Sequence, residues 1–297
     1  MSKLRATGCL VLSGAAAAIV TGCTGGVLDP HGPVTAAEKT LLLNSIGIML
    51  GVIVPVIVAT LGVAWWYRAS NGKARYRPTW SYSGKIEIVT WSIPAMVILL
   101  LGSIAWISSH ELAPEKPLAA RAPAIEVQVV ALDWKWLFIY PRLGVASVNL
   151  MVVPAGAPVS LRLTSATVMN SFFIPQLGSQ IYTMAGMTTR LNLLADHPGR
   201  YRGLSAQFSG DGFSGMGFSV EAVTPQQFTT WVSDTKQKGR LLDWPGYTQL
   251  ARPSRYVVPS TYGAVDPGLF ERIVGPEHLA AGCAGDHDLS KVSCSAN

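Results

Sequence analysis

The stretch IEVQVVALDWKW, residues 125–136, decides how the second half of this chain folds. Apolar and polar residues alternate through much of it, and β-branched and aromatic types are frequent, which is typical of a strand with one buried face. Four later stretches share this character: SVNLMVVPAG (147–156), PVSLRLTS (158–165), MTTRLNLLA (187–195) and GMGFSVEAV (215–223). Turn residues separate them, so they predict an antiparallel β-sandwich over residues 124–223.

Two charge-free stretches precede this predicted sandwich. Residues 40–67 and 88–109 contain no charged side chain, and each is long enough to cross a hydrocarbon core of about 30 Å as a helix. The loop between them, residues 68–87, carries five Lys or Arg side chains. The positive-inside rule therefore places this loop in the cytoplasm and both ends of the hairpin in the periplasm. Residues 110–123 are a Pro- and Ala-rich linker.

The composition agrees with a membrane protein. Charged residues make up 13% of the chain and hydrophobic residues 49%, whereas an average soluble domain has about 25% charged residues. The formal net charge is +6, but much of the excess lies in the loop of residues 68–87. We therefore expect no nucleic-acid partner.

The N-terminus has the features of a bacterial export signal. Residues 1–22 begin with basic residues and continue with a short apolar core, CLVLSGAAAAIV. Val20-Thr21-Gly22-Cys23 resembles a lipoprotein cleavage site, which predicts a lipid anchor on Cys23 and a periplasmic N-terminus over residues 23–39. The alternative is an ordinary signal peptide that contains a cysteine. In the tail, Cys283 and Cys294 either form a disulfide in an oxidising periplasm or remain free thiols.

Residues 224–297 form a C-terminal extension. The stretch TPQQFTTWVSDTKQKG, residues 224–239, predicts a helix with Thr224 as N-cap, Pro225 at the first helical position and Gln227 three residues after the cap. Gly239 is a natural stop. From Asp243 onward no period is strong, so an irregular or partly mobile segment is expected. The predicted fold class is a membrane-anchored α+β protein with a helical or irregular extension.

Three longer motifs resemble one known family. ALDWKWLFIYP (131–141) resembles an aromatic strand, VMNSFFIPQLGSQIYTMAGMTTRL (168–191) a loop with its following strand, and PGRYRGLSAQFSGDGFSGMGF (198–218) a metal loop. With the helical hairpin and the lipid-anchor motif, they resemble subunit II of the haem–copper terminal oxidases. The resemblance extends from Cys23 to about Pro259. It implies that the sandwich is cupredoxin-like.

In the copper-bearing branch of that family, two His, two Cys, a Met and a Glu backbone carbonyl hold a dinuclear copper centre. The corresponding residues here are Asn170 and Phe213 for the histidines, Ser205 and Ser209 for the cysteines, Gln207 for the glutamate, and Met216 for the methionine. Serine does not ionise near neutral pH and is a hard ligand, and phenylalanine does not coordinate copper. We therefore expect no metal at these former copper positions. His197 is expected in a turn away from the loop, in a structural or solvent-facing role.

This loss of ligands resembles the cytochrome bo-type quinol oxidase branch. The residues FTTWV…LLDWPGYTQLARPSRY (228–256) resemble its aromatic-rich extension. The resemblance implies a non-redox accessory subunit of a proton-translocating ubiquinol oxidase in the bacterial inner membrane. Its partners would be the haem–copper core subunit I, subunits III and IV, and lipid. Haems, copper and the ubiquinol chemistry would belong to the core subunit, with no catalytic residue here and no soluble cytochrome c as donor.

Individual residues leave some choices open. Glu87, at the start of the second apolar span, is either a proton-entry residue, as the resemblance implies, or an interfacial residue beside Lys85. Trp134 and Trp136 lie two apart, which predicts one face of a strand and a packing role. Two other functions compete. The first is a copper electron-transfer subunit II of a cytochrome c oxidase, against which the absence of the cysteine thiolates argues. The second is a stand-alone membrane-anchored binding lipoprotein, which would purify without partner subunits.

Overall fold

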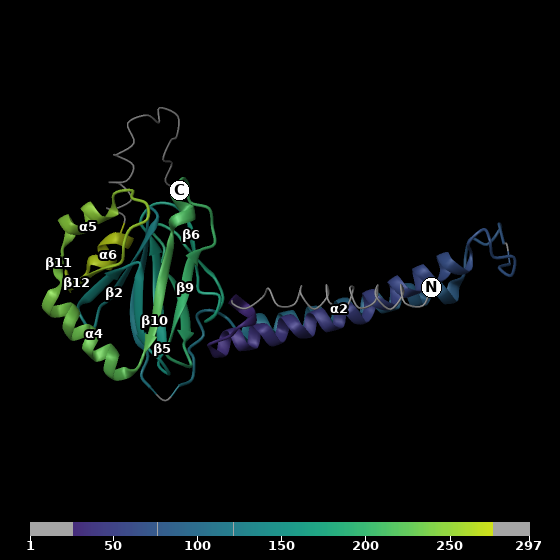
Figure 1. Cartoon of the computed structure of the whole chain (residues 1–297), viewed down its shortest axis with the longest axis horizontal. Helices are drawn as coiled ribbons and strands as arrows, with labels where there is room; N and C mark the ends of the chain where they lie inside the picture. Colours follow the sequence, from purple (N-terminus) through teal and green to yellow (C-terminus); the bar gives the residue numbers. More distant parts are fainter. Residues whose placement is uncertain (1–25, 76, 121, 276–297) are drawn as a thin grey trace, which may run out of the picture. The chain divides into compact units, whose positions relative to one another are not determined.

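The structure, a computed structural model, describes residues 26–75, 77–120 and 122–275 (Figure 1). By its internal contacts the chain divides into two compact units. One is the helical segment Ala37–Ala113, and the other takes in the remaining described residues. The two-helix and sandwich architecture predicted from the sequence is confirmed.

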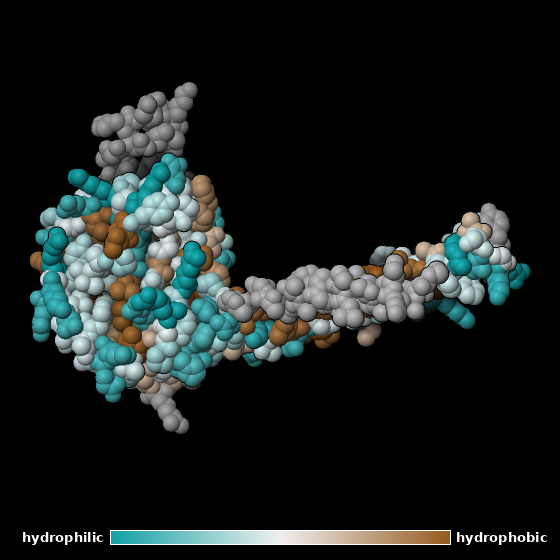
Figure 2. All heavy atoms as spheres, in the orientation of Figure 1, coloured by the Kyte–Doolittle hydropathy of each residue, from teal (hydrophilic) through white to brown (hydrophobic). Residues whose placement is uncertain are grey.

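The helical unit consists of two long apolar helices. Helix α2 spans Pro33–Trp66 and helix α3 spans Gly84–Glu111, and both are long and apolar enough to cross a membrane. Helix α2 begins before the charge-free run of residues 40–67, at the end expected in the periplasm, and α3 extends beyond the run of residues 88–109 at both ends. The thickness of the hydrocarbon core sets the length of the apolar run, but it does not set the length of the helix, because a helix can continue into water. Figure 2 shows hydrophobic residues along the visible side of the helices and hydrophilic residues around the connecting loop.

The second unit is a sandwich of two sheets. The seven-stranded sheet has the order β11-β12-β3-β2-β1-β5-β8, and the five-stranded sheet has the order β4-β10-β9-β6-β7. The strands of the larger sheet are β1 (Ile125–Leu132), β2 (Lys135–Tyr140), β3 (Val145–Val148), β5 (Pro158–Ser165), β8 (Thr189–Leu194), β11 (Arg240–Leu242) and β12 (Ser260–Val265). Those of the smaller sheet are β4 (Leu150–Pro154), β6 (Asn170–Phe173), β7 (Ile181–Thr183), β9 (Gly199–Ser205) and β10 (Gly217–Val223).

Both sheets are mixed, which the period-two pattern did not reveal. Strand β1 pairs parallel with β5, and β10 pairs parallel with β4, whereas most other neighbours are antiparallel. Alternation reports which face of a strand is buried, but it carries no information on the direction of the neighbouring strand.

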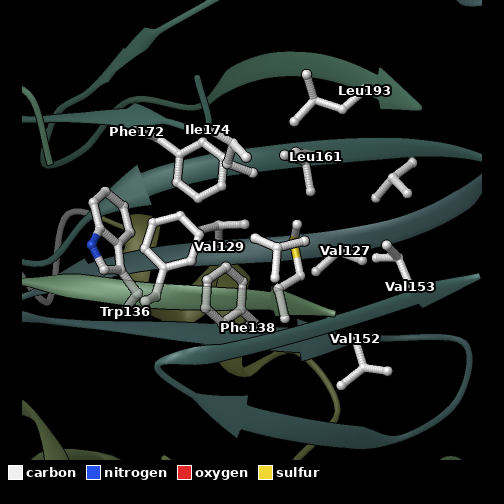
Figure 3. Packing of buried hydrophobic residues seen from close by; sticks show 14 of the residues in the cluster. Val127, Val129, Trp136, Phe138, Val152, Val153, Leu161, Phe172, Ile174 and Leu193 are labelled. Atoms are coloured by element: carbon white, nitrogen blue, oxygen red, sulfur yellow. The ribbon is translucent and has the colours of Figure 1, made fainter. Parts of the chain in front are cut away.

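The core between the sheets is rich in aromatic rings. The Phe172 and Phe218 rings stack with centroids 5.0 Å apart, and Trp136 meets Phe172 edge-on at 5.2 Å. Figure 3 shows Trp136, Phe138 and Phe172 at one end of this core and aliphatic residues at the other. Each of these rings buries about 150–250 Å² of surface, so the aromatic end contributes much of the stability. It lies directly beneath the loop that joins β9 to β10.

The C-terminal extension is more ordered than the sequence indicated. Helix α4, Pro225–Lys238, has the predicted capping box at Thr224 and ends at Gly239, so that prediction is confirmed. Residues 252–259 form no helix or strand, but the expectation of an irregular segment after Asp243 was wrong for most of the other described residues. These form α5 (Trp244–Ala251), β12 and α6 (Leu269–Val274), and β12 pairs antiparallel with β3.

The extension builds a second core on the outer face of the larger sheet. Strands β1 and β2 place Val130, Leu132, Leu137 and Ile139 on that face, against side chains of the extension. The extension contributes the buried residues Leu242, Tyr247, Leu269, Phe270 and Ile273. Strands β1 and β2 are consequently covered on both faces.

The chain enters and leaves the sandwich unit close to strand β8. A short 3-10 helix, η1 (Gly26–Leu28), precedes His31, whose N–H donates to the Gln176 carbonyl at 2.9 Å. The His31 carbonyl accepts from the Asp196 N–H at 2.9 Å, and the Asn192 N–H donates to the Pro114 carbonyl at 2.8 Å. Backbone hydrogen bonds therefore fix both connections to the same edge of the sandwich unit.

Candidate functional site

The loop of residues 206–216, which resembles the metal loop of the family, joins β9 to β10. Backbone hydrogen bonds between residues of the loop form its turns. The Phe213 N–H donates to the Gly210 carbonyl at 3.1 Å, and the Met216 N–H donates to the Phe213 carbonyl at 3.0 Å, around the 3-10 helix η2 (Phe213–Gly215). At the mouth of the loop, the Ser205 N–H donates to the Met216 carbonyl at 3.4 Å. Local backbone hydrogen bonds therefore account for much of the loop shape.

Three of the former copper positions meet at the end of the smaller sheet. Asn170 begins β6 and Ser205 ends β9, and both are at most 5% exposed. The Ser205 hydroxyl lies 3.2 Å from Asn170 Oδ1 and 3.2 Å from the Gln207 carbonyl oxygen, so it can donate to either. Asn170 Nδ2 donates to the Val168 carbonyl at 3.1 Å. The Ser205 hydroxyl and both ends of the Asn170 amide therefore have hydrogen-bond partners.

The other three positions form two separate contacts. Ser209 Oγ lies 3.7 Å from the sulfur of Met216, a buried side chain. Phe213 packs edge-on against Phe208 with ring centroids 5.6 Å apart. The structure thus brings Asn170, Ser205 and Gln207 together and pairs Ser209 with Met216, while Phe213 packs with another ring.

This donor set does not fit a dinuclear copper centre. Its side chains offer hydroxyl, amide and thioether groups, whereas such a centre needs thiolates and imidazoles. The hydroxyl and amide of Ser205 and Asn170 are already engaged with each other. In the parts of the chain that the structure describes, no three His, Cys, Asp or Glu side chains lie together as metal ligands would. His197 lies in the bend between β8 and β9, at the opposite end of β9, and its carbonyl accepts from the Tyr201 hydroxyl at 2.9 Å.

Comparison with known proteins identifies the family. Residues 127–223 match the family described as the periplasmic domain of cytochrome c oxidase subunit II, and residues 236–275 match the COX aromatic rich motif. The chain is 48% identical over 256 residues to the cytochrome bo(3) ubiquinol oxidase subunit 2 of Pseudomonas putida, covering 86% of this chain and 82% of that protein.

Two further relatives agree. The ubiquinol oxidase subunit 2 of Acetobacter aceti is 48% identical over 260 residues, covering 87% of this chain and 84% of that protein. The quinol oxidase subunit 2 of Bacillus cereus is 34% identical over 228 residues, with 76% and 78% covered. The chain belongs to the ubiquinol oxidase subunit 2 family. It is therefore a membrane-anchored subunit of a terminal quinol oxidase, an oxidoreductase complex.

Trp134 lies elsewhere than the sequence predicted. It does not share a strand face with Trp136, because β1 ends at Leu132 and β2 begins at Lys135, which leaves Trp134 in the turn at a φ of 63°. Its Nε1–H donates to the Ser209 carbonyl at 3.0 Å. The alternation rule failed here because Asp133 and Trp134 form a tight turn without the usual Gly or Asn. Trp136 is fully buried, as a packing role requires.

Residues of the extension also contact the loop, which sequence reasoning missed. Arg255 Nη2 lies 3.2 Å from Asp211 Oδ2. A Cβ on Gly215 would lie only 2.8 Å from Tyr256 Cε1, and a Cβ on Gly212 would overlap the Trp134 ring. Gly212 and Gly215 therefore leave room for aromatic rings, which gives a physical reason for glycine at both positions.

Glu87 lies in the first turn of α3, where its N–H donates to the Ser83 carbonyl at 3.0 Å. Its side chain is exposed and borders a surface depression with Tyr82 and Trp91. A carboxylate in the first turn also interacts favourably with the helix dipole. The geometry is therefore compatible with both interpretations made from the sequence.

The predictions for the two ends of the chain fall outside the described residues. They concern the lipid anchor at Cys23, together with the signal of residues 1–22, and the pair Cys283 and Cys294. They remain predictions.

Proposed function

We propose that this chain is a copper-free, non-redox accessory subunit of a proton-translocating ubiquinol oxidase. The observation that carries the proposal is the neutral donor set of Asn170, Ser205 and Gln207, in which the Ser205 hydroxyl can donate to the Asn170 amide oxygen or to the Gln207 carbonyl. A neutral hydroxyl does not replace a bridging thiolate, so this end of the sandwich lacks the groups that a copper electron relay requires. The role of the chain is then to bind and stabilise its partner subunits.

The chemistry of the complex would lie in other subunits. We assign ubiquinol oxidation and oxygen reduction, with the haems and copper that they need, to a haem–copper core subunit I. Subunits III and IV complete the proposed complex, and no soluble cytochrome c is required as donor. Helices α2 and α3, whose apolar side chains are mostly exposed in the single chain, offer surfaces for lipid and for the core subunit.

The proposed orientation places the sandwich in the periplasm. The five basic residues in the loop of residues 68–87 support a cytoplasmic loop. A diacylglyceryl group on Cys23 would add a second anchor. Mass spectrometry of the N-terminal peptide tests this anchor, since a mature chain that begins at another residue contradicts it.

At the cytoplasmic end of α3, we assign Glu87 a part in proton uptake. Its exposed carboxylate in the first helical turn supports this role. The role is separate from that of the loop between β9 and β10.

A tagged full-length chain purified from membranes tests the proposed function. It should co-purify with a multi-helix haem protein, show a haem spectrum and consume oxygen with ubiquinol, but not with reduced cytochrome c. The untagged chain provides the control for non-specific capture. Purification of the chain alone would favour a stand-alone lipoprotein, and oxidation of cytochrome c would favour a cytochrome c oxidase. Either result contradicts the proposal.

A further inference from the structure

One segment of the extension lies across the loop that joins β9 to β10. Residues 252–258, which we term the strap, follow helix α5 and precede β12. The strap contacts the sandwich at three places, and each contact joins residues that are far apart in the sequence.

The first contact is made by a buried lysine. Lys135, at the start of β2, is 1% exposed. Its Nζ donates to the Arg252 carbonyl at 2.8 Å and to the Ser254 hydroxyl at 2.7 Å. Burial lowers the pKa of Lys135, while Asp133 acts in the opposite direction. A buried ammonium is costly unless its donors are satisfied, and the strap supplies two of the acceptors.

The second contact is made by Asn149, which lies between β3 and β4 and is 5% exposed. Its Oδ1 accepts from the Trp136 N–H at 2.8 Å, and its Nδ2 donates to the Val257 carbonyl at 2.8 Å. A buried polar side chain of the sandwich therefore holds each end of the strap.

The third contact is between the middle of the strap and the loop itself. Arg255 pairs with Asp211, and its guanidinium carbon lies 5.4 Å from the centre of the Trp134 ring. Trp134 in turn donates to the Ser209 carbonyl. Tyr256 lies against Gly215 and has a φ of 53°, a left-handed conformation that is unusual for a tyrosine.

We propose that the strap is a built-in ligand of the loop, which it holds in shape where copper-bearing relatives have metal–ligand bonds, and that Lys135 and Asn149 fasten it. The surface of the loop around Gly215 is thus occupied by the protein's own chain. This inference deepens the proposed function and rests on its copper-free loop; hydrogen exchange tests the strap, whereas copper loading tests the absence of copper.

Hydrogen exchange of the full-length chain in detergent tests the proposal. In Lys135→Met, amides of both the strap and residues 206–216 should exchange about ten-fold faster or more, as expected when hydrogen bonds to a charged group are lost. Amides of β1 should be unchanged. Lys238→Met, at an exposed position in the last turn of α4, is the matched control and should behave like the wild type.

A second variant guards against loss of folding in Lys135→Met. Tyr256 is 73% exposed, and Asn tolerates a positive φ, so Tyr256→Asn removes the ring without disturbing the core. It should speed exchange in residues 206–216 while the midpoint of thermal unfolding stays at the wild-type value. If loop exchange is unchanged in Tyr256→Asn, or if only the strap exchanges faster in Lys135→Met, the strap rests on the loop without holding it. Either result overturns the proposal.

Discussion

The hydroxyl of Ser205 lies 3.2 Å from the amide oxygen of Asn170, and both side chains are buried at the end of the smaller sheet. By the family resemblance, these positions carry a cysteine and a histidine in copper-bearing relatives. In this chain the same two positions hold a neutral hydrogen bond. The structure thus shows these two positions packed and joined by a hydrogen bond.

Removal of this hydroxyl should destabilise the chain. Ser205→Ala leaves the Asn170 oxygen without its donor in a buried place, which costs about 1–3 kcal/mol of unfolding free energy. Ser160→Ala, at a half-buried position in β5, is the control and should stay within about 0.5 kcal/mol of the wild type. Chemical denaturation of the full chain in detergent measures both. Equal stabilities would mean that the hydrogen bond is not stabilising.

The second core predicts that the extension contributes strongly to stability. Phe270→Ala in α6 removes a ring that is 1% exposed, and should lower the unfolding free energy by about 3–5 kcal/mol. Leu241→Ala, at a side chain that is 57% exposed, should change it by less than about 0.5 kcal/mol. The same denaturation experiment compares them. Similar small effects would show that α6 is not part of a cooperative core.

This second core also shows where sequence reasoning reached its limit. The capping box at Thr224 and the apolar spans are local signals, and both were predicted. The pairing of β12 with β3 joins Thr261 to Ser147, and no local pattern reports such a distant partner. One clue was present in the sequence. Val130, Leu132, Leu137 and Ile139 are apolar where a half-exposed strand would be polar, which indicates strands covered on both faces.

Only part of the candidate site was predicted, because sequence patterns report local features and not contacts between distant residues. Resemblance to the family's metal loop located Asn170, Ser205 and Met216, and the structure brings the first two into contact. The contacts of Trp134 and Tyr256 with the loop depend on left-handed backbone conformations in non-glycine residues. Such conformations are set by tertiary packing and have no reliable sequence signal.

Stability should fall at alkaline pH because of Tyr140. Burial raises the pKa of this tyrosine above its ordinary value of about 10, although its hydroxyl hydrogen-bonds with the Val152 backbone. As pH rises, the unfolded chain loses the proton first, so the contribution of Tyr140 is present below about pH 10 and is lost above it. Thermal unfolding between about pH 9 and 11 measures this slope.

Tyr140→Phe should be less stable near neutral pH, because it loses these hydrogen bonds, but its stability should fall less steeply above about pH 10. Tyr182→Phe is the control, since this tyrosine is 44% exposed, and it should keep the wild-type slope. If Tyr140→Phe also keeps the wild-type slope, the raised pKa of Tyr140 does not contribute.

Glu87→Gln should reduce both turnover and proton pumping of the purified complex, because an amide does not carry a proton in and out. Glu111→Gln, at the other end of α3, is the matched control and should have wild-type activity. Oxygen consumption and proton release from reconstituted vesicles measure the two properties. Unchanged values in Glu87→Gln would assign this carboxylate to the membrane interface alone.

We propose that this subunit carries no copper relay, and copper loading of the purified chain is the decisive measurement. The full-length chain, purified without its partners, would be incubated with copper, desalted, and measured by elemental analysis and visible absorption. We expect no stoichiometric copper and no purple absorption, with the same result for Ser205→Ala. Two tightly bound coppers per chain with a purple absorption band, lost in Ser205→Ala, would contradict it.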